Sequence, residues 1–198
     1  MRASAVPIAA AVLFTLAIGP ACAAGEGGAP SNVVFVPWKV LKTGDVPPPG
    51  VLVLYWIPLS RDDFRHSELL IYKPLTAYAP QCVSMLVVQA DDADTIARLG
   101  AGKLPIAILG EGDKVLGIVE SDRGALHAPD VDKLLRGTID AREEELNRDL
   151  DDAPKKLATG DRDAAVALYR HVWEQRCLFP RHAREAERAL KKLGEPTQ

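Results

Sequence analysis

The run Val51–Trp56 is the feature that most constrains how this chain of 198 residues can fold. Its unbroken apolar sequence, Val-Leu-Val-Leu-Tyr-Trp, predicts a strand that is covered on both faces. The polar turn Ser60-Arg61-Asp62-Asp63 follows, and Ser60 or Asp62 can cap a helix there. Open α/β sheets place ligands where a buried strand hands over to a helix. We therefore expect the fold, and any site, to be organised around this junction.

A second apolar run, Cys82–Gln89, predicts another strand covered on both faces, and hence a sheet with helices on each side. The expected fold class is therefore α/β. Local patterns suggest the remaining elements: an edge strand within Val33–Leu41, a helix over Arg61–Tyr78 that Pro74 kinks or splits, a short helix over Asp91–Leu99, strands over Lys103–Leu109 and Val115–Val119, and a helix from Asp130 to about Leu146. Together they predict one domain over residues 33–147.

The N-terminal residues have the pattern of a secretory signal peptide. Arg2 precedes an uncharged apolar segment, and the small residues Ala21-Cys22-Ala23-Ala24 follow it. We predict that residues 1–23 are cleaved, that residues 24–32 form a flexible leader, and that the protein is exported to the periplasm or the extracellular space. A retained membrane anchor and a lipidated Cys22 are the alternatives, but the apolar segment is short for a span. No membrane span is expected after cleavage.

Charge and motif content exclude several function classes. The formal net charge is −3, and cleavage removes Arg2 but no acid, so the mature chain is mildly acidic. This balance argues against a nucleic-acid surface. The sequence has no Gly-rich phosphate loop and no G-x-S-x-G elbow, and its histidines lack the spacing of zinc ligands: His66, His127, His171 and His182. We expect no metal and no cofactor.

Two cysteines, Cys82 and Cys177, remain after the predicted cleavage. Distant thiols often pair in an oxidising compartment, but their spacing alone cannot prove it. If joined, they would fasten the C-terminal segment to the core and stabilise it by a few kcal/mol. If reduced, each is expected to be a small buried hydrophobe.

The composition becomes charged and alanine-rich from Asp149 onward, which predicts a helical extension over residues 148–198. Gly160-Asp161 separates two expected helices, and Phe179-Pro180 separates the second from a third. Four features resemble a tetratricopeptide repeat: Gly160-Asp161, Ala165, Tyr169 and Pro180. About one and a half repeats are too few to stand alone, so we expect the extension to pack on the first domain or on a partner. It is either a helical brace or a peptide-binding groove.

Residues 33–146 resemble the thioredoxin superfamily. Val51–Trp56 is similar to the family's central strand with its terminal aromatic residue. Ala97–Leu109 resembles the segment in which a helix ends and a cis-proline, here Pro105, precedes a strand. The hairpin Gly110–Val115 and a terminal helix complete the likeness, and Trp56 and Pro105 are 49 residues apart, close to the family's spacing. The resemblance implies a central mixed sheet flanked by helices.

The resemblance fails where the family carries its redox thiols. The C-x-x-C motif would fall on Ser60-Arg61-Asp62-Asp63, where neither end is a cysteine. Disulfide exchange needs an attacking thiolate and a second thiol that resolves the mixed disulfide. The family's redox-inactive members commonly act as binding or chaperone-like modules, and the family docks extended substrates at the cis-proline loop, here Leu104-Pro105. Ser60–Asp63 and Leu104-Pro105 are therefore the expected binding segments.

A weaker resemblance to peroxiredoxins, carried by Tyr55–Ser60 and Ser67-Glu68, leads to the same conclusion about thiols. Their peroxidatic cysteine would fall at Arg65. Thiol peroxidase chemistry is therefore excluded with either alignment.

The junction also carries a dense set of ionisable side chains: Arg61, Asp62, Asp63, Arg65, His66 and Glu68. Paired carboxylates beside a histidine can perform acid–base chemistry. The alternative is an ordinary solvated helix N-terminus, where the helix dipole favours acids. We favour the second interpretation.

Three functional hypotheses follow. The first is an exported, redox-inactive protein that binds a protein or extended peptide as a chaperone-like or assembly module. The second is an enzyme, a thiol–disulfide interchange protein of the cell envelope that uses Cys82 and Cys177. The third is a structural module whose helices complete a partner complex.

Overall fold

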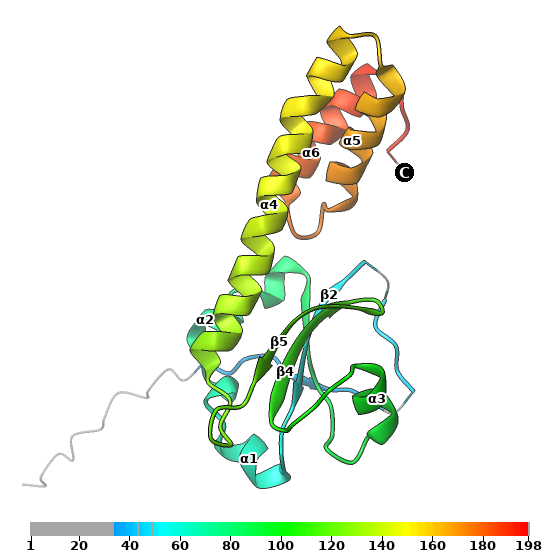
Figure 1. Ribbon diagram of the computed structural model, residues 1–198. Coiled ribbons are helices and arrows are strands. Elements are labelled where there is room, and N and C mark those ends of the chain that lie inside the picture. Colours follow the sequence, from blue (N-terminus) through cyan, green and yellow to red (C-terminus); the bar gives the residue numbers. More distant parts are fainter. Residues whose placement is uncertain (1–33, 43, 49, 198) are drawn as a thin grey trace, which may run out of the picture. The chain divides into compact units, whose positions relative to one another are not determined.

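The computed structural model describes residues 34–42, 44–48 and 50–197 (Figure 1). The predicted signal peptide (1–23) and leader (24–32) lie outside these residues. A five-stranded mixed sheet has the order β1-β3-β2-β4-β5, with these bounds: β1 Lys39–Val40, β2 Leu52–Ile57, β3 Val83–Val87, β4 Ile106–Glu111 and β5 Lys114–Glu120. Strands β1 and β2 run parallel to β3, whereas β4 is antiparallel to β2 and β5.

Strand β2 is the centre of the sheet, as its apolar run predicts. All its residues are buried, and successive side chains point to opposite faces. Leu54 and Trp56 belong to the core that packs against α4 (Ala128–Ala158), and Tyr55 belongs to the core beneath α3 (Ala93–Arg98). The prediction that this strand is covered on both faces is confirmed.

The segment Arg61–Tyr78 after β2 is split, which is one of the two outcomes predicted for it, and the division goes further than a single break at Pro74. It contains four short pieces: α1 Arg61–His66, a 3-10 turn η1 Glu68–Leu70, α2 Lys73–Thr76 and a 3-10 turn η2 Ala79–Gln81. Ser67 is extended at ψ 136° and ends α1. Pro74 lies in the first turn of α2, where its missing N–H removes no helical hydrogen bond. Of the two outcomes predicted for Pro74, a kink or a split, the structure has the split, with the proline in the first turn of the new helix.

The C-terminal helices form as predicted except at one boundary. Helix α4 does not end near Leu146 but continues to Ala158; α5 (Arg162–Glu174) and α6 (Pro180–Lys192) follow. Leu146 and Ala153 on α4 are buried in a second core with α5 and α6, so the helix has an apolar face along its whole length. The predicted boundary between residues 147 and 148 falls inside this helix. None of the described helices is long and apolar enough to cross a membrane.

Two contacts fasten the extension to the sheet-bearing part. A disulfide joins Cys82, at the start of β3, to Cys177, between α5 and α6, with the Cα atoms 5.7 Å apart. The Arg142 guanidinium on α4 donates two hydrogen bonds, of 3.2 and 2.6 Å, to the carboxylate of Glu111 on β4. Such a bidentate pair fixes orientation as well as distance. Of the two alternatives for the cysteines, the structure contains the disulfide.

A buried hydrogen bond joins the segment before β3 to α4. The Tyr78 hydroxyl donates to Asp132 Oδ1 at 2.8 Å, and Arg136 donates to the other oxygen of Asp132 at 2.9 Å. Burial raises the pKa of Tyr78 above its ordinary value of 10.0, and the hydrogen bond to Asp132 adds to this rise. The folded state therefore favours the protonated phenol. Its stabilising effect is complete below pH 10 and is lost as the pH rises through the folded pKa.

We expect Tyr78→Phe to lower the free energy of unfolding at pH 7 by about 1 kcal/mol, because a buried hydrogen bond is lost. Above about pH 10 the variant should lose less stability than the wild type, since the titrating phenol is gone. Urea unfolding at a series of pH values measures both effects. Tyr72→Phe, at a half-buried position, is the control and should change stability by at most about 0.5 kcal/mol. Parallel pH profiles for Tyr78→Phe and the wild type would contradict this account.

Candidate functional site

The turn after β2 is built as a helix cap. Ser60 Oγ accepts a hydrogen bond from the Asp63 N–H at 3.1 Å, and Asp63 Oδ2 accepts one from the Leu59 N–H at 2.8 Å. The two side chains thereby satisfy backbone donors at both sides of the N-terminus of α1, in the manner of a capping box. These are the two positions at which the C-x-x-C motif would place thiols. A hydroxyl and a carboxylate engaged in this way offer no route to disulfide exchange.

The ionisable side chains around this turn do not converge on one point. Asp63 is used in the cap, and Arg61 and Asp62 are exposed. Glu68 belongs to a different contact: its Oε1 accepts the Ala128 N–H at 2.6 Å and so caps the N-terminus of α4. Asp62 and His66 form an exposed pair, with His66 Nδ1 3.5 Å from Asp62 Oδ1. The choice between a solvated helix N-terminus and an acid–base site stays a prediction.

The second predicted segment, Leu104-Pro105, lies beside the turn. Ile57 of β2 is paired with Ile106 of β4, so the residues that follow Ile57 and precede Ile106 are neighbours at one end of the sheet. The Leu104-Pro105 peptide bond is cis. Pro105 is buried and Leu104 is half-buried. The register thus places near each other the two segments that the resemblance in the sequence singles out.

A groove opens on the β3 side of the turn, where sequence reasoning did not place one. Its volume is about 570 Å³, and it is lined by Val40, Pro58, Ser60, Arg61, Phe64, Val87, Gln89, Ala90 and Asp91. Val40 is 56 % exposed, and Leu59, within the turn, is 55 % exposed. The lining comes from the carboxyl ends of β1, β2 and β3 and from α1, so no short motif could reveal it. The sequence therefore carried no signal for this groove.

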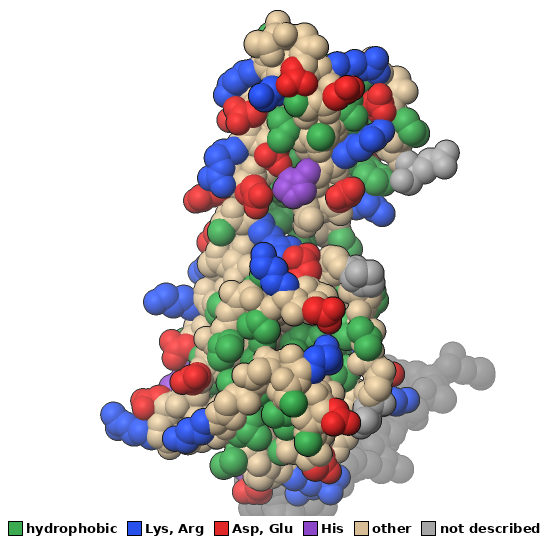
Figure 2. All heavy atoms as spheres, turned by 45° about the vertical axis from the view of Figure 1, so that its right-hand side comes forward, with side chains coloured by type: hydrophobic (Ala, Val, Ile, Leu, Met, Phe, Trp, Pro, Cys, Tyr) green, Lys and Arg blue, Asp and Glu red, His purple; other side chains and the backbone are tan. Residues whose placement is uncertain are grey.

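An aromatic stack supports one wall of the groove. Phe64, which lines it, stacks on the buried Trp56 with ring centroids 5.1 Å apart, and Trp38 meets Trp56 edge-on at 5.3 Å. The Trp38 indole N–H donates to the Leu69 carbonyl at 2.8 Å, which fixes that ring. On the face shown in Figure 2, hydrophobic side chains gather over the sheet-bearing part, and charged side chains are spread over the C-terminal helices. Phe64 therefore gives the groove an aromatic wall that the buried Trp56 supports from the core.

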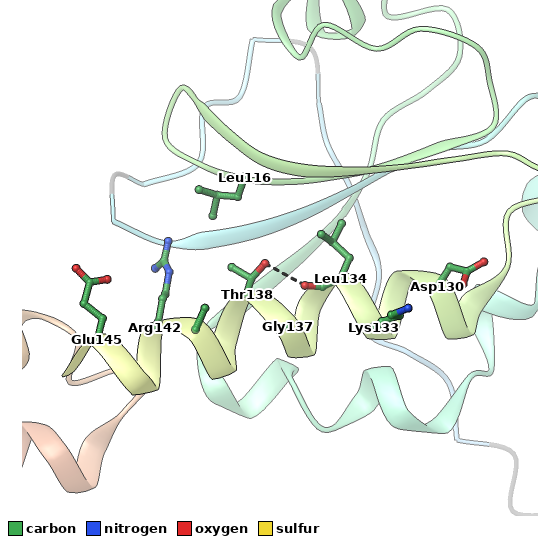
Figure 3. Close-up of a pocket in the computed structure, with 9 residues that line it drawn as sticks. Leu116, Asp130, Lys133, Leu134, Gly137, Thr138, Arg142 and Glu145 are labelled. Atoms are coloured by element: carbon green, nitrogen blue, oxygen red, sulfur yellow. Dashed lines mark hydrogen bonds between the residues drawn. The ribbon is translucent and has the colours of Figure 1, made fainter. Parts of the chain in front are cut away.

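A second hollow, of about 640 Å³, lies between β5 and α4 (Figure 3). Leu116 points from β5 toward the helix, where Leu134 and Thr138 face it. Thr138 donates to the carbonyl of Leu134 at 3.0 Å, and Arg142 is paired with Glu111. Leu116 of β5 lies at the β-bulge, where β5 pairs with Leu109 and Gly110 of β4. These residues are at the end of β4 that is far from Ile106. This hollow is therefore separate from the turn, and its central polar groups already have partners.

The histidines occupy separate places. His171 Nδ1 lies 2.6 Å from Asp149 Oδ2, His182 Nε2 lies 3.0 Å from Asn147 Oδ1, and His66 Nδ1 lies 3.0 Å from the Asp62 carbonyl. Within the described ranges, no group of three or more His, Cys, Asp or Glu side chains could hold a metal ion.

Comparison with known proteins adds a likeness of fold. No protein-family model matches the sequence, and no curated protein matches it. Among solved structures, the chain is similar to the crystal structure of thioredoxin from Trypanosoma brucei brucei, at 21 % identity and a TM-score of 0.34, over 46 % of this chain and 78 % of that one. The sheet and helices of this chain form the α/β arrangement that the thioredoxin resemblance in the sequence implies, a mixed sheet flanked by helices, with an all-α C-terminal extension. The tetratricopeptide character of the extension stays a prediction.

Proposed function

We propose that this chain is an exported, redox-inactive, thioredoxin-like module that holds an extended polypeptide in the groove beside α1. The observation that carries the proposal is an apolar groove directly beside a turn whose thiol positions form a helix cap. Export rests on the predicted signal peptide. Intact-mass measurement of the native protein tests it, and a chain starting at Ala24 is expected.

The chemistry of the groove suits a polypeptide with an exposed apolar side chain. Its walls include Val40, Phe64 and Val87, and polar side chains such as Arg61 and Gln89 accompany them. A site of this kind buries an apolar group and uses a few polar groups to orient the rest of the ligand. An unfolded or extended client offers apolar side chains together with a polar backbone. A chaperone-like or assembly role follows from that preference.

We expect Val40→Asp to weaken the binding of an unfolded client by at least about tenfold, because a charge would enter the apolar groove. The probe is fluorescein-labelled α-lactalbumin that has been reduced and carboxymethylated so that it stays unfolded, and binding is followed by fluorescence anisotropy. Val40 is 56 % exposed, so the fold should survive the change.

The matched control is Val46→Asp. Val46 is 72 % exposed and does not line the groove. Unchanged affinity is expected for this control. Equal affinities for the wild type and Val40→Asp, or no binding of the client to the wild type, would overturn the proposed site.

One observation favours the enzymatic alternative. Cys177 is exposed, so a thiolate in solution can reach the Cys177 sulfur of the disulfide. A thiol–disulfide interchange protein that works through Cys82 and Cys177 would reduce insulin in the presence of dithiothreitol. Robust turnover that disappears in Cys82→Ser would replace the binding proposal with this one.

A further inference from the structure

Strand β5 leaves one edge of the sheet open. It is the last strand in the order, and among the residues that the structure describes only β4 pairs with it. Alternate residues of such a strand point their backbone N–H and C=O groups away from the sheet, where another strand can pair with them. Lys114 and Glu120 stand at the two ends of β5, and the residues between them are uncharged. The centre of this edge therefore lacks the charged side chains that discourage strand addition.

The hollow between β5 and α4 contains a glycine that the chain itself does not require. Gly137 lies inside α4, where glycine is less stable than alanine. Its backbone is not in the left-handed region, and a Cβ built on it would have no heavy atom of a neighbouring element within 4 Å. Gly117 of β5 is different, because a Cβ there would collide with Leu134. Gly137 thus keeps space open above the helix backbone (Figure 3).

The two faces of β5 offer different surfaces to an added strand. On the α4 face, Leu116 and Ala141 line the hollow together with Gly137. Ile118 is paired with Ile108, whose side chain belongs to the core beneath α3, so Ile118 faces away from α4. It is 44 % exposed. Side chains of an added strand would therefore enter the hollow and cover Ile118 in alternation.

We propose that β5 accepts an extended segment of a partner protein as an added antiparallel strand, with an apolar side chain of that segment seated over Gly137. Antiparallel pairing is slightly more stable per residue than parallel pairing. Neither Lys114 nor Glu120 forms an ion pair with a residue that the structure describes. The segment should therefore carry a base near its N-terminal end, opposite Glu120, and an acid near its C-terminal end, opposite Lys114.

A second copy of β5 would satisfy the charges but not the hollow. If Lys114 of one copy lies opposite Glu120 of the other, the two Gly117 residues lie opposite each other. The second copy then offers no side chain at the centre of the edge. A different sequence is therefore the better occupant, and the inference does not depend on the groove beside α1.

The experiment selects phage-displayed random dodecapeptides on the full mature protein and measures the enriched peptides, labelled with fluorescein, by fluorescence anisotropy. Enriched sequences should have a base followed about six residues later by an acid, with apolar residues in alternation between them. Two copies of each peptide are then methylated at alternate backbone nitrogens. One copy should lose at least about tenfold in affinity and the other should keep it, because only one set of N–H groups faces β5.

Gly137→Leu separates a binding site from a structural role. Leucine would fill the hollow, so peptide affinity should fall at least about tenfold. The melting temperature should rise by about 2–4 °C, because leucine forms helices better than glycine. A rise in melting temperature with unchanged affinity would overturn the role of the hollow.

The double substitution Lys114→Glu/Glu120→Lys tests the direction of the added strand. It should weaken the selected peptides roughly tenfold and restore the affinity of copies in which the base and the acid are exchanged. Lys39→Glu is the matched control, since Lys39 is exposed on β1 at the opposite edge of the sheet, and it should leave affinity unchanged.

Four results would overturn the proposal. The first is that no peptide is enriched, and the second is that both methylated copies bind as well as the parent peptide. The third is a loss of binding with Lys39→Glu or Val40→Asp, which would assign the peptides to the other edge or to the groove beside α1. The fourth is a dimer of the peptide-free protein in sedimentation equilibrium that Lys114→Glu dissociates, because a second copy would then occupy β5.

Discussion

Replacing both Cys82 and Cys177 by serine is expected to lower the free energy of unfolding by about 2–5 kcal/mol. The disulfide joins residues separated by 95 positions, so it removes a large loop from the unfolded ensemble. In the folded state it ties the connection between α5 and α6 to the start of β3. The variant should still fold, because α4 runs unbroken into the extension and the Arg142–Glu111 pair remains.

Urea unfolding followed by circular dichroism measures this effect. The wild type with dithiothreitol should behave like the double serine variant, and the variant itself should be insensitive to the reductant. Amide hydrogen exchange adds a local readout: protection should fall more in α6 than in β2, whose backbone lies in the centre of the sheet. A loss below about 1 kcal/mol would show that the bond contributes little beyond the helical packing.

The central strand and the fold class could be predicted because their signals are local and strong. An apolar run such as Val51–Trp56 has few alternatives to a buried strand, and its order relative to Pro105 identifies the fold. The segment after it was harder to predict. Apolar residues at helical spacing predicted a helix over Arg61–Tyr78 that Pro74 kinks or splits; the split at Pro74 is present, but the earlier break at Ser67 was not predicted.

The end of α4 was predicted too early in the sequence. The change in composition near Asp149 suggested a boundary, yet Leu146 and Ala153 continue the apolar face into the second core. The disulfide and the grooves could not be derived from sequence at all. Pairing depends on whether the two Cα atoms come within reach, and the groove beside α1 joins Val40 and Val87, which only strand pairing places together.

The sequence alone allowed more to be inferred about the turn Ser60–Asp63 than about the grooves. The absence of thiols at positions 60 and 63 is visible in the residues alone, and it predicts lost redox chemistry. The structure adds the reason why the turn persists without them: Ser60 and Asp63 satisfy the backbone at the start of α1. Positions 60 and 63 therefore form a stable helix N-terminus without thiols.

Thiols placed at positions 60 and 63 are expected to give the turn disulfide-exchange activity. We expect the double substitution Ser60→Cys/Asp63→Cys, made in the Cys82→Ser/Cys177→Ser background, to reduce insulin at least about tenfold faster than that background. Ser60 is the N-cap of α1, where the helix dipole stabilises a thiolate, and position 63 lies one turn on, within reach to resolve a mixed disulfide. Insulin turbidity in dithiothreitol measures the rate.

The single substitution Ser60→Cys in the same background is the matched control. It supplies an attacking thiolate without a resolving thiol on the protein, so each mixed disulfide must be resolved by dithiothreitol and the rate should stay close to that of the background. If the double substitution is inactive although both thiols titrate, the turn does not hold them in a productive geometry, and the likeness to a redox turn ends at the backbone. If the unmodified wild type is already as active, the activity belongs to Cys82 and Cys177, and the chain is an interchange enzyme rather than a binding module.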